Sequence, residues 1–222
     1  MINDAINVNG EARILVSTGQ SQFEFFNALI EEEIEWTKVT MFHLDEYIGV
    51  GEDHPASFVK YLKERFVGRV PLKTAHFING LNDPNDEIKK INALVSEAPV
   101  DAAFIGIGEN AHIAFNDPPA DFETDSPFII VTLNETCKRQ QVREGWFPGL
   151  DSVPKTAISI SPRQIMAAKV IISVVPHAVK AKAVAETLAS HSADKMIPAS
   201  LLKEHPSWTL FLDEASASLI DD

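Results

Sequence analysis

The stretch ILVSTGQSQFEFF, Ile14–Phe26, contains the strand–loop–helix pattern on which the fold prediction rests. Ile14–Val16 is a short, β-branched apolar run of the kind found in buried strands. A polar turn with a glycine at its centre, Ser17–Ser21, follows it and marks the end of the strand. The apolar spacing after the turn predicts a helix over Ser21–Glu33.

This alternation continues along the chain. Buried strands are predicted at Arg13–Val16, Val39–Leu44, Ala102–Ile107, Phe128–Leu133, Ala157–Ile160, Val170–Val175 and Thr209–Leu212. Besides the first helix, amphipathic or Ala-rich helices are predicted at Ser57–Phe66, Asp86–Ala98, Arg163–Ala168 and Val179–Ser190. Strands that alternate with helices predict an α/β fold with a doubly wound, mainly parallel sheet and helices on both of its faces.

We expect residues 1–222 to form one domain, because 45% of them are hydrophobic and no linker or repeat interrupts the pattern. The junctions Asp83–Pro84 and Asp117–Pro118 are expected to be loops. Met1–Val8 resembles the last turns of a helix that closes at Gly10. We therefore expect the extreme N-terminal strand and part of the first helix to be missing from this sequence.

Composition restricts the class of protein. The net charge of −13 argues against a nucleic-acid-binding surface, which needs clustered positive charge. The sequence contains no apolar run long enough to span a bilayer and no signal-peptide pattern, and Cys137 is its single cysteine. These features predict a soluble protein of the cytoplasm, without a disulfide or a zinc cluster.

Ligands of open parallel sheets bind beyond the carboxyl ends of the strands, so the polar residues there are candidate site residues. The first group is Ser17, Thr18, Gly19, Gln20 and Ser21. Its hydroxyls and backbone N–H groups could hold an anion, or the loop could simply end in a Ser helix cap. It lacks the Gly-Lys-Ser/Thr of a nucleotide-binding P-loop.

The second group follows the strand at Val39, where Asp45 and Glu46 are adjacent. Successive side chains of an extended segment point in opposite directions, so one carboxylate faces the site and the other serves the structure. A carboxylate at this place is suited to act as a general base. The spacing of His43 and His54 fits no compact zinc pattern.

The third group lies in GIGENAHIAFNDPP, Gly106–Pro119. Gly108 permits a sharp turn, and Asn110, His112 and Asp117 can gather around one imidazole. Histidine moves protons near neutral pH, and an amide or carboxylate partner fixes its tautomer. A buried structural histidine is the alternative.

Cations for an anionic ligand come from two places. Lys180 and Lys182 open a predicted helix, where positive charge is unfavourable unless an anion offsets it. The stretch CKRQQVR adds Arg139 and Arg143, although basic residues are also common on a solvated helix face.

Taken together, several motifs resemble the glucosamine-6-phosphate deaminase family, in order, from about Ile14 to Leu219. They are STGQS, FHLDEYIG followed by DHPASF, GIGENAHIAFNDP, VPKTAISIS, VKAKAV and LLKEHPSWTLFLDEAS. The sister enzyme 6-phosphogluconolactonase shares some of them, but its histidine loop usually lacks the I-A-F-N-[ED]-P continuation. The resemblance therefore favours the deaminase.

The resemblance implies a Rossmann-like fold that converts glucosamine 6-phosphate and water to fructose 6-phosphate and ammonia, without a metal or organic cofactor. Asp45 matches the carboxylate that moves a proton between C2 and C1. His112 matches the ring-opening histidine, and Asn110 and Asp117 match its relay partners. The residues that match the phosphate-binding groups are Ser17–Ser21, Lys180 and either Arg139 or Arg143. The sequence does not determine the oligomeric state, and a homo-oligomer is possible.

The chain departs from the family pattern at several of these positions. Asn110 stands where Asp is usual, Asp117 where Glu is usual, and Gln20 and Gln22 where Gly and Pro are common. An amide cannot stabilise an imidazolium as a carboxylate does, so Glu109 is a candidate for the missing charge. The alternatives to a deaminase are a lactonase, in which His112 activates water, and a catalytically weak sugar-phosphate-binding protein.

Overall fold

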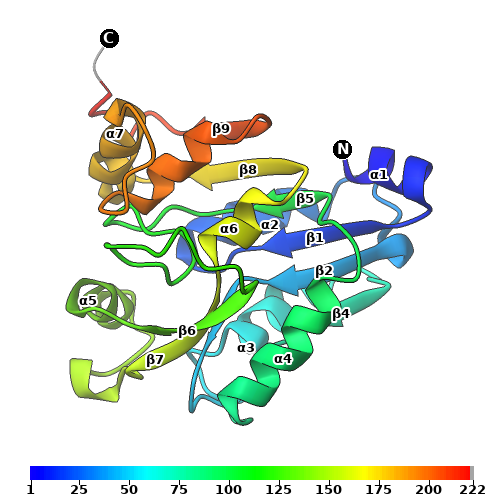
Figure 1. Cartoon of the computed structure of the whole chain (residues 1–222), viewed down its shortest axis with the longest axis horizontal. Helices are drawn as coiled ribbons and strands as arrows, with labels where there is room; N and C mark the ends of the chain where they lie inside the picture. Colours follow the sequence, from blue (N-terminus) through cyan, green and yellow to red (C-terminus); the bar gives the residue numbers. More distant parts are fainter. Residues whose placement is uncertain (221–222) are drawn as a thin grey trace.

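The computed structural model describes residues 1–220, and its largest feature is a sheet of six parallel strands (Figure 1). The strand order is β4-β2-β1-β5-β8-β9. The strands are β1 (Ala12–Val16), β2 (Val39–His43), β4 (Thr74–His76), β5 (Ala102–Phe104), β8 (Val170–Val175) and β9 (Trp208–Leu212). The order reverses between β1 and β5, and the parallel α/β architecture is confirmed.

Helices cover both faces of this sheet, because alternate strand residues enter two separate cores. Leu15 of β1 packs in the core that includes residues of α4, α6 and α7, whereas its neighbour Ile14 packs with α1, α2 and α3. The helices are α1 (Ile2–Asn9), α2 (Phe23–Leu29), α3 (Phe58–Leu62), α4 (Pro84–Val95), α6 (Pro162–Met166) and α7 (Ala181–Ala189). Short 3₁₀ turns lie at Gln20–Gln22, Trp36–Lys38, Leu150–Ser152, Ala178–Lys180 and Pro198–Glu204.

A second, antiparallel sheet lies beside the first and was not predicted (Figure 1). Its order is β3-β7-β6, from β3 (Asp45–Tyr47), β7 (Thr156–Ile160) and β6 (Phe128–Thr132). Two of the predicted strands belong here and not in the parallel sheet, since an apolar run does not specify its pairing partner. α5 (Glu135–Arg143) follows β6 and begins at Asn134, whose side chain caps it.

Several helices begin or end at other residues than predicted. Asp83–Pro84 begins α4 instead of forming a loop: the Asp83 side chain accepts hydrogen bonds from the first turn, and Pro84 needs no N–H partner there. α2 ends at Leu29, and α3 continues as a π-helical turn over Lys63–Val67. These shifts leave the strand order unchanged.

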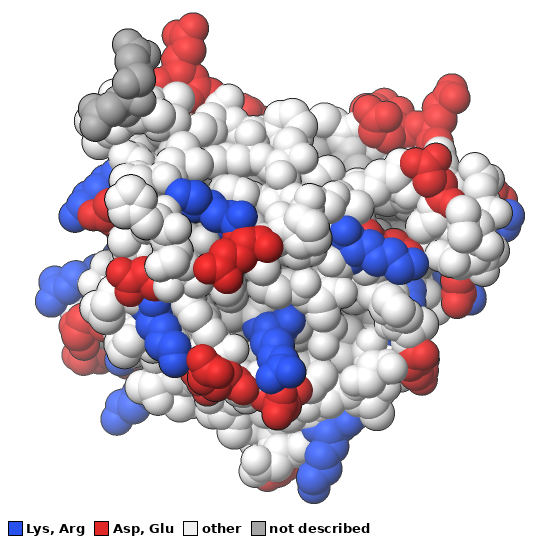
Figure 2. All heavy atoms as spheres, turned by 45° about the horizontal axis from the view of Figure 1, so that its top comes forward, with Lys and Arg blue, Asp and Glu red and all other residues white. Residues whose placement is uncertain are grey.

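The surface carries charges of both signs. On the face shown in Figure 2, basic and acidic side chains alternate and form no broad region of one sign. Among residues 1–220, no helix combines the length and apolar composition that crossing a bilayer requires.

Candidate active site

A cavity of about 310 Å³ lies at the carboxyl ends of the parallel strands. The loops after β1, β2, β5 and β8 supply its walls, and α5 with the residues that follow it supplies a further wall. Most of the predicted site residues line it: Ser17, Thr18, Gly19, Gln20, Ser21, Asp45, Gly108, Glu109, His112, Arg143 and Lys180. Residues 163 positions apart in the chain thus meet in one cavity because neighbouring parallel strands end at the same edge.

The loop Ser17–Ser21 and Lys180 form one end of the cavity. The Ser17 hydroxyl accepts a hydrogen bond from the Gly106 N–H at 3.1 Å, which ties the β1 loop to the β5 loop. Gly19 has a φ of 110°, a conformation open to glycine, and its carbonyl accepts the Tyr61 hydroxyl at 2.9 Å. This loop is therefore held in shape before any ligand arrives.

Lys180 is the buried cation of this end, with only 6% of its surface exposed. Burial lowers the pKa of Lys180, against the opposing effect of Glu144 and Glu109. Among the residues described, its ammonium group has no hydrogen-bond or ion-pair partner. Lys182, by contrast, is exposed and lies 3.6 Å from Glu186. A buried ammonium group beside a loop of hydroxyls and N–H groups is suited to an anionic ligand.

Asp45 lines the cavity from the start of β3. It is 6% exposed, and within residues 1–220 its carboxylate makes no hydrogen bond or ion pair. Burial, and then the neighbouring Glu46 carboxylate, raise the pKa of Asp45 well above its ordinary value. An unpaired carboxylate of raised pKa is a stronger base than an exposed aspartate, as general-base catalysis requires.

Glu46 points to the opposite side of β3 and is a structural residue, as the alternation of strand side chains predicts. Its carboxylate accepts hydrogen bonds from the Ser57 hydroxyl at 2.9 Å and the Val59 N–H at 3.0 Å, at the start of α3. It also accepts the Tyr47 N–H at 2.9 Å. Glu46 thus fixes α3 against the strand that carries Asp45.

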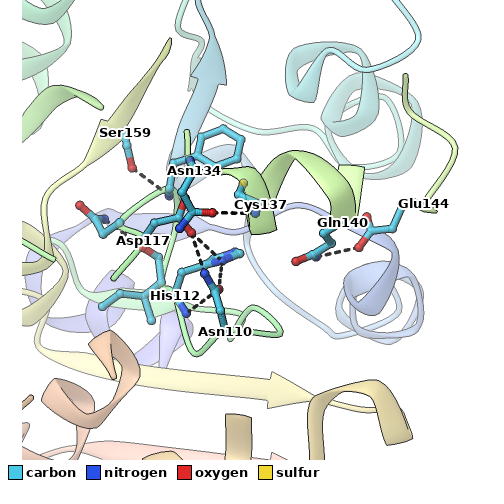
Figure 3. Close-up of polar contacts among 11 residues, drawn as sticks. Asn110, His112, Asp117, Asn134, Cys137, Gln140, Glu144 and Ser159 are labelled. Carbon is cyan, nitrogen blue, oxygen red and sulfur yellow. Dashed lines mark hydrogen bonds and ion pairs between the residues drawn. The ribbon is translucent and has the colours of Figure 1, made fainter. Parts of the chain in front are cut away.

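His112 is held by the predicted pair, Asn110 and Asp117 (Figure 3). Its Nδ1 lies 2.6 Å from Oδ1 of Asn110 and 3.4 Å from Oδ1 of Asp117, and the Asn110 amide donates to the same Asp117 oxygen at 3.0 Å. Both neighbours of Nδ1 are acceptors, so this network assigns the proton to Nδ1 and leaves Nε2 free.

The carboxylate near the imidazole is that of Asp117, and not that of Glu109, the candidate for the missing charge. Burial opposes ionisation of Asp117, but hydrogen bonds from His112, Asn110 and the Asn134 N–H outweigh it and lower its pKa. Glu109 is instead paired with Arg143. The group therefore retains one carboxylate although Asn occupies position 110.

Gly108 makes room for His112. A Cβ atom built on Gly108 would lie 2.2 Å from the Nε2 and Cε1 atoms of the imidazole, inside any permitted contact. Glycine is needed here for close approach of the ring to the backbone.

The structure distinguishes the two candidate arginines. Arg143, at the end of α5, lines the cavity, whereas Arg139 is exposed on the helix surface, 3.6 Å from Glu135. Of the two predicted candidates, Arg143 therefore lines the cavity, and Arg139 does not.

Several further cavity residues were not predicted, among them Gln140, Gln141, Glu144 and Trp146. These four come from α5 and the turn after it, and in the sequence they look like ordinary polar positions of a solvated helix. Only the docking of α5 over the strand ends reveals them. Within residues 1–220, no cluster of three or more His, Cys, Asp or Glu side chains is arranged to hold a metal ion.

The fold and the cavity are those of an α/β enzyme with its site at the carboxyl edge of a parallel sheet, lined by a loop of hydroxyl groups, a buried carboxylate and a histidine. The chain belongs to the family of glucosamine-6-phosphate isomerases and 6-phosphogluconolactonases, which matches residues 1–211.

Individual relatives agree with this assignment. Glucosamine-6-phosphate deaminase of Streptococcus suis is 36% identical over 213 residues, 95% of this chain and 89% of the relative. The Oenococcus oeni enzyme of the same name is 32% identical, over 92% of this chain and 85% of the relative. A solved structure of a monomeric glucosamine-6-phosphate deaminase superposes with a TM-score of 0.88 at 31% identity, over 97% of this chain and 91% of that one.

The sister activity shares the fold. The 6-phosphogluconolactonase of Thermotoga maritima superposes with a TM-score of 0.77 at 14% identity, over 95% of this chain and 88% of that one. At this identity the likeness concerns the fold alone.

Proposed function

We propose that this protein is a glucosamine-6-phosphate deaminase, which converts glucosamine 6-phosphate and water to fructose 6-phosphate and ammonia. The observation that carries the proposal is the unpaired, buried Asp45 carboxylate in the same cavity as His112 and the Ser17–Ser21 loop. The relatives that share this reaction name support it.

The substrate phosphate binds at the end of the cavity formed by Ser17–Ser21 and Lys180. Hydroxyls, backbone N–H groups and one buried ammonium group neutralise the phosphate charge. Arg143 adds a second cation when it exchanges Glu109 for the phosphate.

Ring opening uses His112. Its free Nε2 takes the proton of the C1 hydroxyl and returns it to the ring oxygen, so that the aldehyde of the open chain forms. While the imidazole carries the extra proton, the Asp117 carboxylate, 3.4 Å from Nδ1, stabilises its positive charge directly. Asp117 also accepts the Asn110 amide and so holds the Asn110 oxygen toward Nδ1.

Asp45 then performs the isomerisation. Its carboxylate takes the proton from C2 of the open chain while the substrate ammonium group gives a proton to the C1 oxygen, so that an enolamine with a C1 hydroxyl forms. The carboxylate then delivers its proton to C1, and the nitrogen lone pair closes the C2=N double bond of an iminium ion. Water adds to C2 and ammonia leaves, which gives the ketone of fructose 6-phosphate.

The test measures ammonia and fructose 6-phosphate released from glucosamine 6-phosphate, with solvent deuterium as a second readout. We expect turnover by the wild type and deuterium at C1 of the product. Absence of turnover in a folded wild-type protein would refute the proposal. Hydrolysis of 6-phosphogluconolactone that survives Asp45→Asn would identify the lactonase instead, since that reaction exchanges no carbon-bound proton.

The proposed substrate also bears on location. The resemblance to enzymes of amino-sugar breakdown and a single free, buried Cys137 support a place in the cytoplasm.

A further inference from the structure

Gln141 is a buried cavity residue. Its amide oxygen is hydrogen-bonded, and its amide nitrogen has no partner within residues 1–220. Gln141 lies on α5, is 6% exposed and lines the cavity. Its Oε1 accepts the Tyr47 hydroxyl at 2.7 Å. Its Nε2 makes no hydrogen bond to any residue from 1 to 220. It is not among the fully buried side-chain polar atoms that lack a partner there, which are His43 Nδ1 and Thr187 Oγ1. The amide nitrogen therefore faces open space in the cavity.

Tyr47 determines which half of the amide is free. A buried hydroxyl needs an acceptor for its one proton, and Oε1 of Gln141 is the acceptor that the described residues offer. Tyr47 itself is fully buried among Phe58, Phe115 and Phe147, with ring centroids 5.1–5.3 Å away. The aromatic cluster thus holds the hydroxyl, and the hydroxyl holds the NH₂ group of Gln141 toward the cavity.

The position of Gln141 along the cavity identifies the part of a ligand that it faces. Tyr47 is two residues after Asp45 on β3, so the two side chains share one side of the strand. Two residues beyond Gln141, Arg143 lines the cavity, and the carbonyl of Glu144 accepts the Gln20 side chain of the phosphate loop at 2.9 Å. Gln141 therefore lies between the Asp45 end and the phosphate end.

We propose that Gln141 is a specificity-determining residue whose Nε2 donates a hydrogen bond to a hydroxyl on C3 or C4 of the open-chain hexose phosphate. These carbons lie between C2, which faces Asp45, and the phosphate at C6. The inference rests on the proposed function, because that function sets the direction of the sugar in the cavity. A donor fixed before binding loses little freedom when the sugar arrives, and it selects an acceptor oxygen at that point.

The test combines variants with deoxy substrates. Gln141→Met keeps the length of the side chain and removes the donor, and we expect kcat/KM for glucosamine 6-phosphate to fall about tenfold. The 3-deoxy and 4-deoxy analogues are then assayed with both proteins. With the analogue that lacks the contacted hydroxyl, Gln141→Met should cost less than about threefold, because the partner is already gone.

Gln164→Met is the matched control. Gln164 lies on α6 and does not line the cavity, so we expect a change below about threefold. Gln141→Glu is a second variant: it keeps the acceptor for Tyr47 but replaces the donor, and should also lower kcat/KM at least tenfold.

Two results would overturn the proposal: wild-type kcat/KM in Gln141→Met, or an equal loss with all three substrates, which indicates a merely structural role. If the wild type releases no ammonia, the proposed function fails by itself. The affinity of the wild type and of Gln141→Met for fructose 6-phosphate, measured by calorimetry, then tests the role of Gln141. Binding about tenfold weaker in the variant would support the proposal, and equal binding would overturn it.

Discussion

The two edges of the parallel sheet both contain buried charges, and they differ in how those charges are partnered. At the amino edge, Arg13 is 5% and Asp101 6% exposed. The Arg13 guanidinium donates to the carbonyls of Leu94, Val95 and Ala98 at the end of α4. Asp101 accepts the Arg13 N–H at 2.8 Å and lies 2.8 Å from the Lys169 ammonium.

At the carboxyl edge, Asp45 and Lys180 are equally buried, at 6% each, yet neither has a partner within the described chain. Buried charges are costly unless they are paired, so an unpaired one marks a place where a ligand completes the set. Burial is therefore the same for these four charged side chains, and they differ in the presence or absence of a partner.

The largest expected effect comes from exchanging Asp45 for asparagine. Asp45→Asn should lower kcat about 10³-fold, because the general base is lost. The free energy of unfolding at pH 7 should rise, since burial disfavours the charged form that the substitution removes. Steady-state ammonia release and urea unfolding test this together. A variant that is slow and also less stable would assign Asp45 a structural role.

Asp101→Asn is the opposite case at the amino edge. We expect a loss of about 3 kcal/mol in the free energy of unfolding, because Lys169 and the Arg13 N–H lose their charged partner. The kcat/KM of the folded fraction should stay within about twofold of the wild type. Loss of catalysis without loss of stability would break the distinction between the edges.

The buried Glu46 carboxylate should make the free energy of unfolding depend on pH. Burial raises its pKa from 4.5 to about 7. The native state thus binds this proton more tightly than the unfolded state, so the stability that Glu46 contributes is complete below pH 4.5 and is lost as pH rises through 7. Relative to Glu46→Gln, the wild type should lose on the order of 3 kcal/mol across this range.

Urea titrations from pH 4 to pH 8 measure this difference between the Asp45→Asn variant and the same variant carrying Glu46→Gln, because Glu46 also raises the pKa of Asp45. Titrations common to both proteins, such as that of His43, then cancel. A constant difference across the range would show that Glu46 keeps its ordinary pKa in the fold.

Lys180→Met should raise KM for the sugar phosphate on the order of 10- to 100-fold, because one charge-assisted hydrogen bond to the phosphate is lost. The stability of the protein should not fall, since a desolvated ammonium group is removed. Lys182→Met is the control: within residues 1–220 this exposed lysine has Glu186 as its one ion-pair partner, and KM should remain unchanged. Equal effects of the two substitutions would remove Lys180 from the phosphate site.

Sequence patterns predicted the strands that are long and apolar, and the cavity residues that directly follow them. They missed β3 and β4, because these short strands are largely polar and lack the apolar run that marked the equally short β5. They placed β6 and β7 in the wrong sheet, because an apolar run does not name its partner.

Within the site, alternation along an extended segment correctly separated Asp45 from Glu46. The choice between Glu109 and Asp117 as the partner of His112 could not be made from spacing, since both lie within five residues of it in the chain. The path of the loop decides: it turns back at Ala114, which has a φ of 52°, and brings Asp117 to the imidazole.

The position of Asp45 also has a consequence for protein engineering. β2 ends at His43 and β3 begins at Asp45, so a single residue, Leu44, separates the parallel ladder from the antiparallel one. His43 is in register with Val16 in one sheet, and Asp45 with Ser159 in the other. The carboxylate is thus supported from both ends, unlike a side chain on a free loop. Transfer of this base to another scaffold would therefore have to carry strands from both sheets.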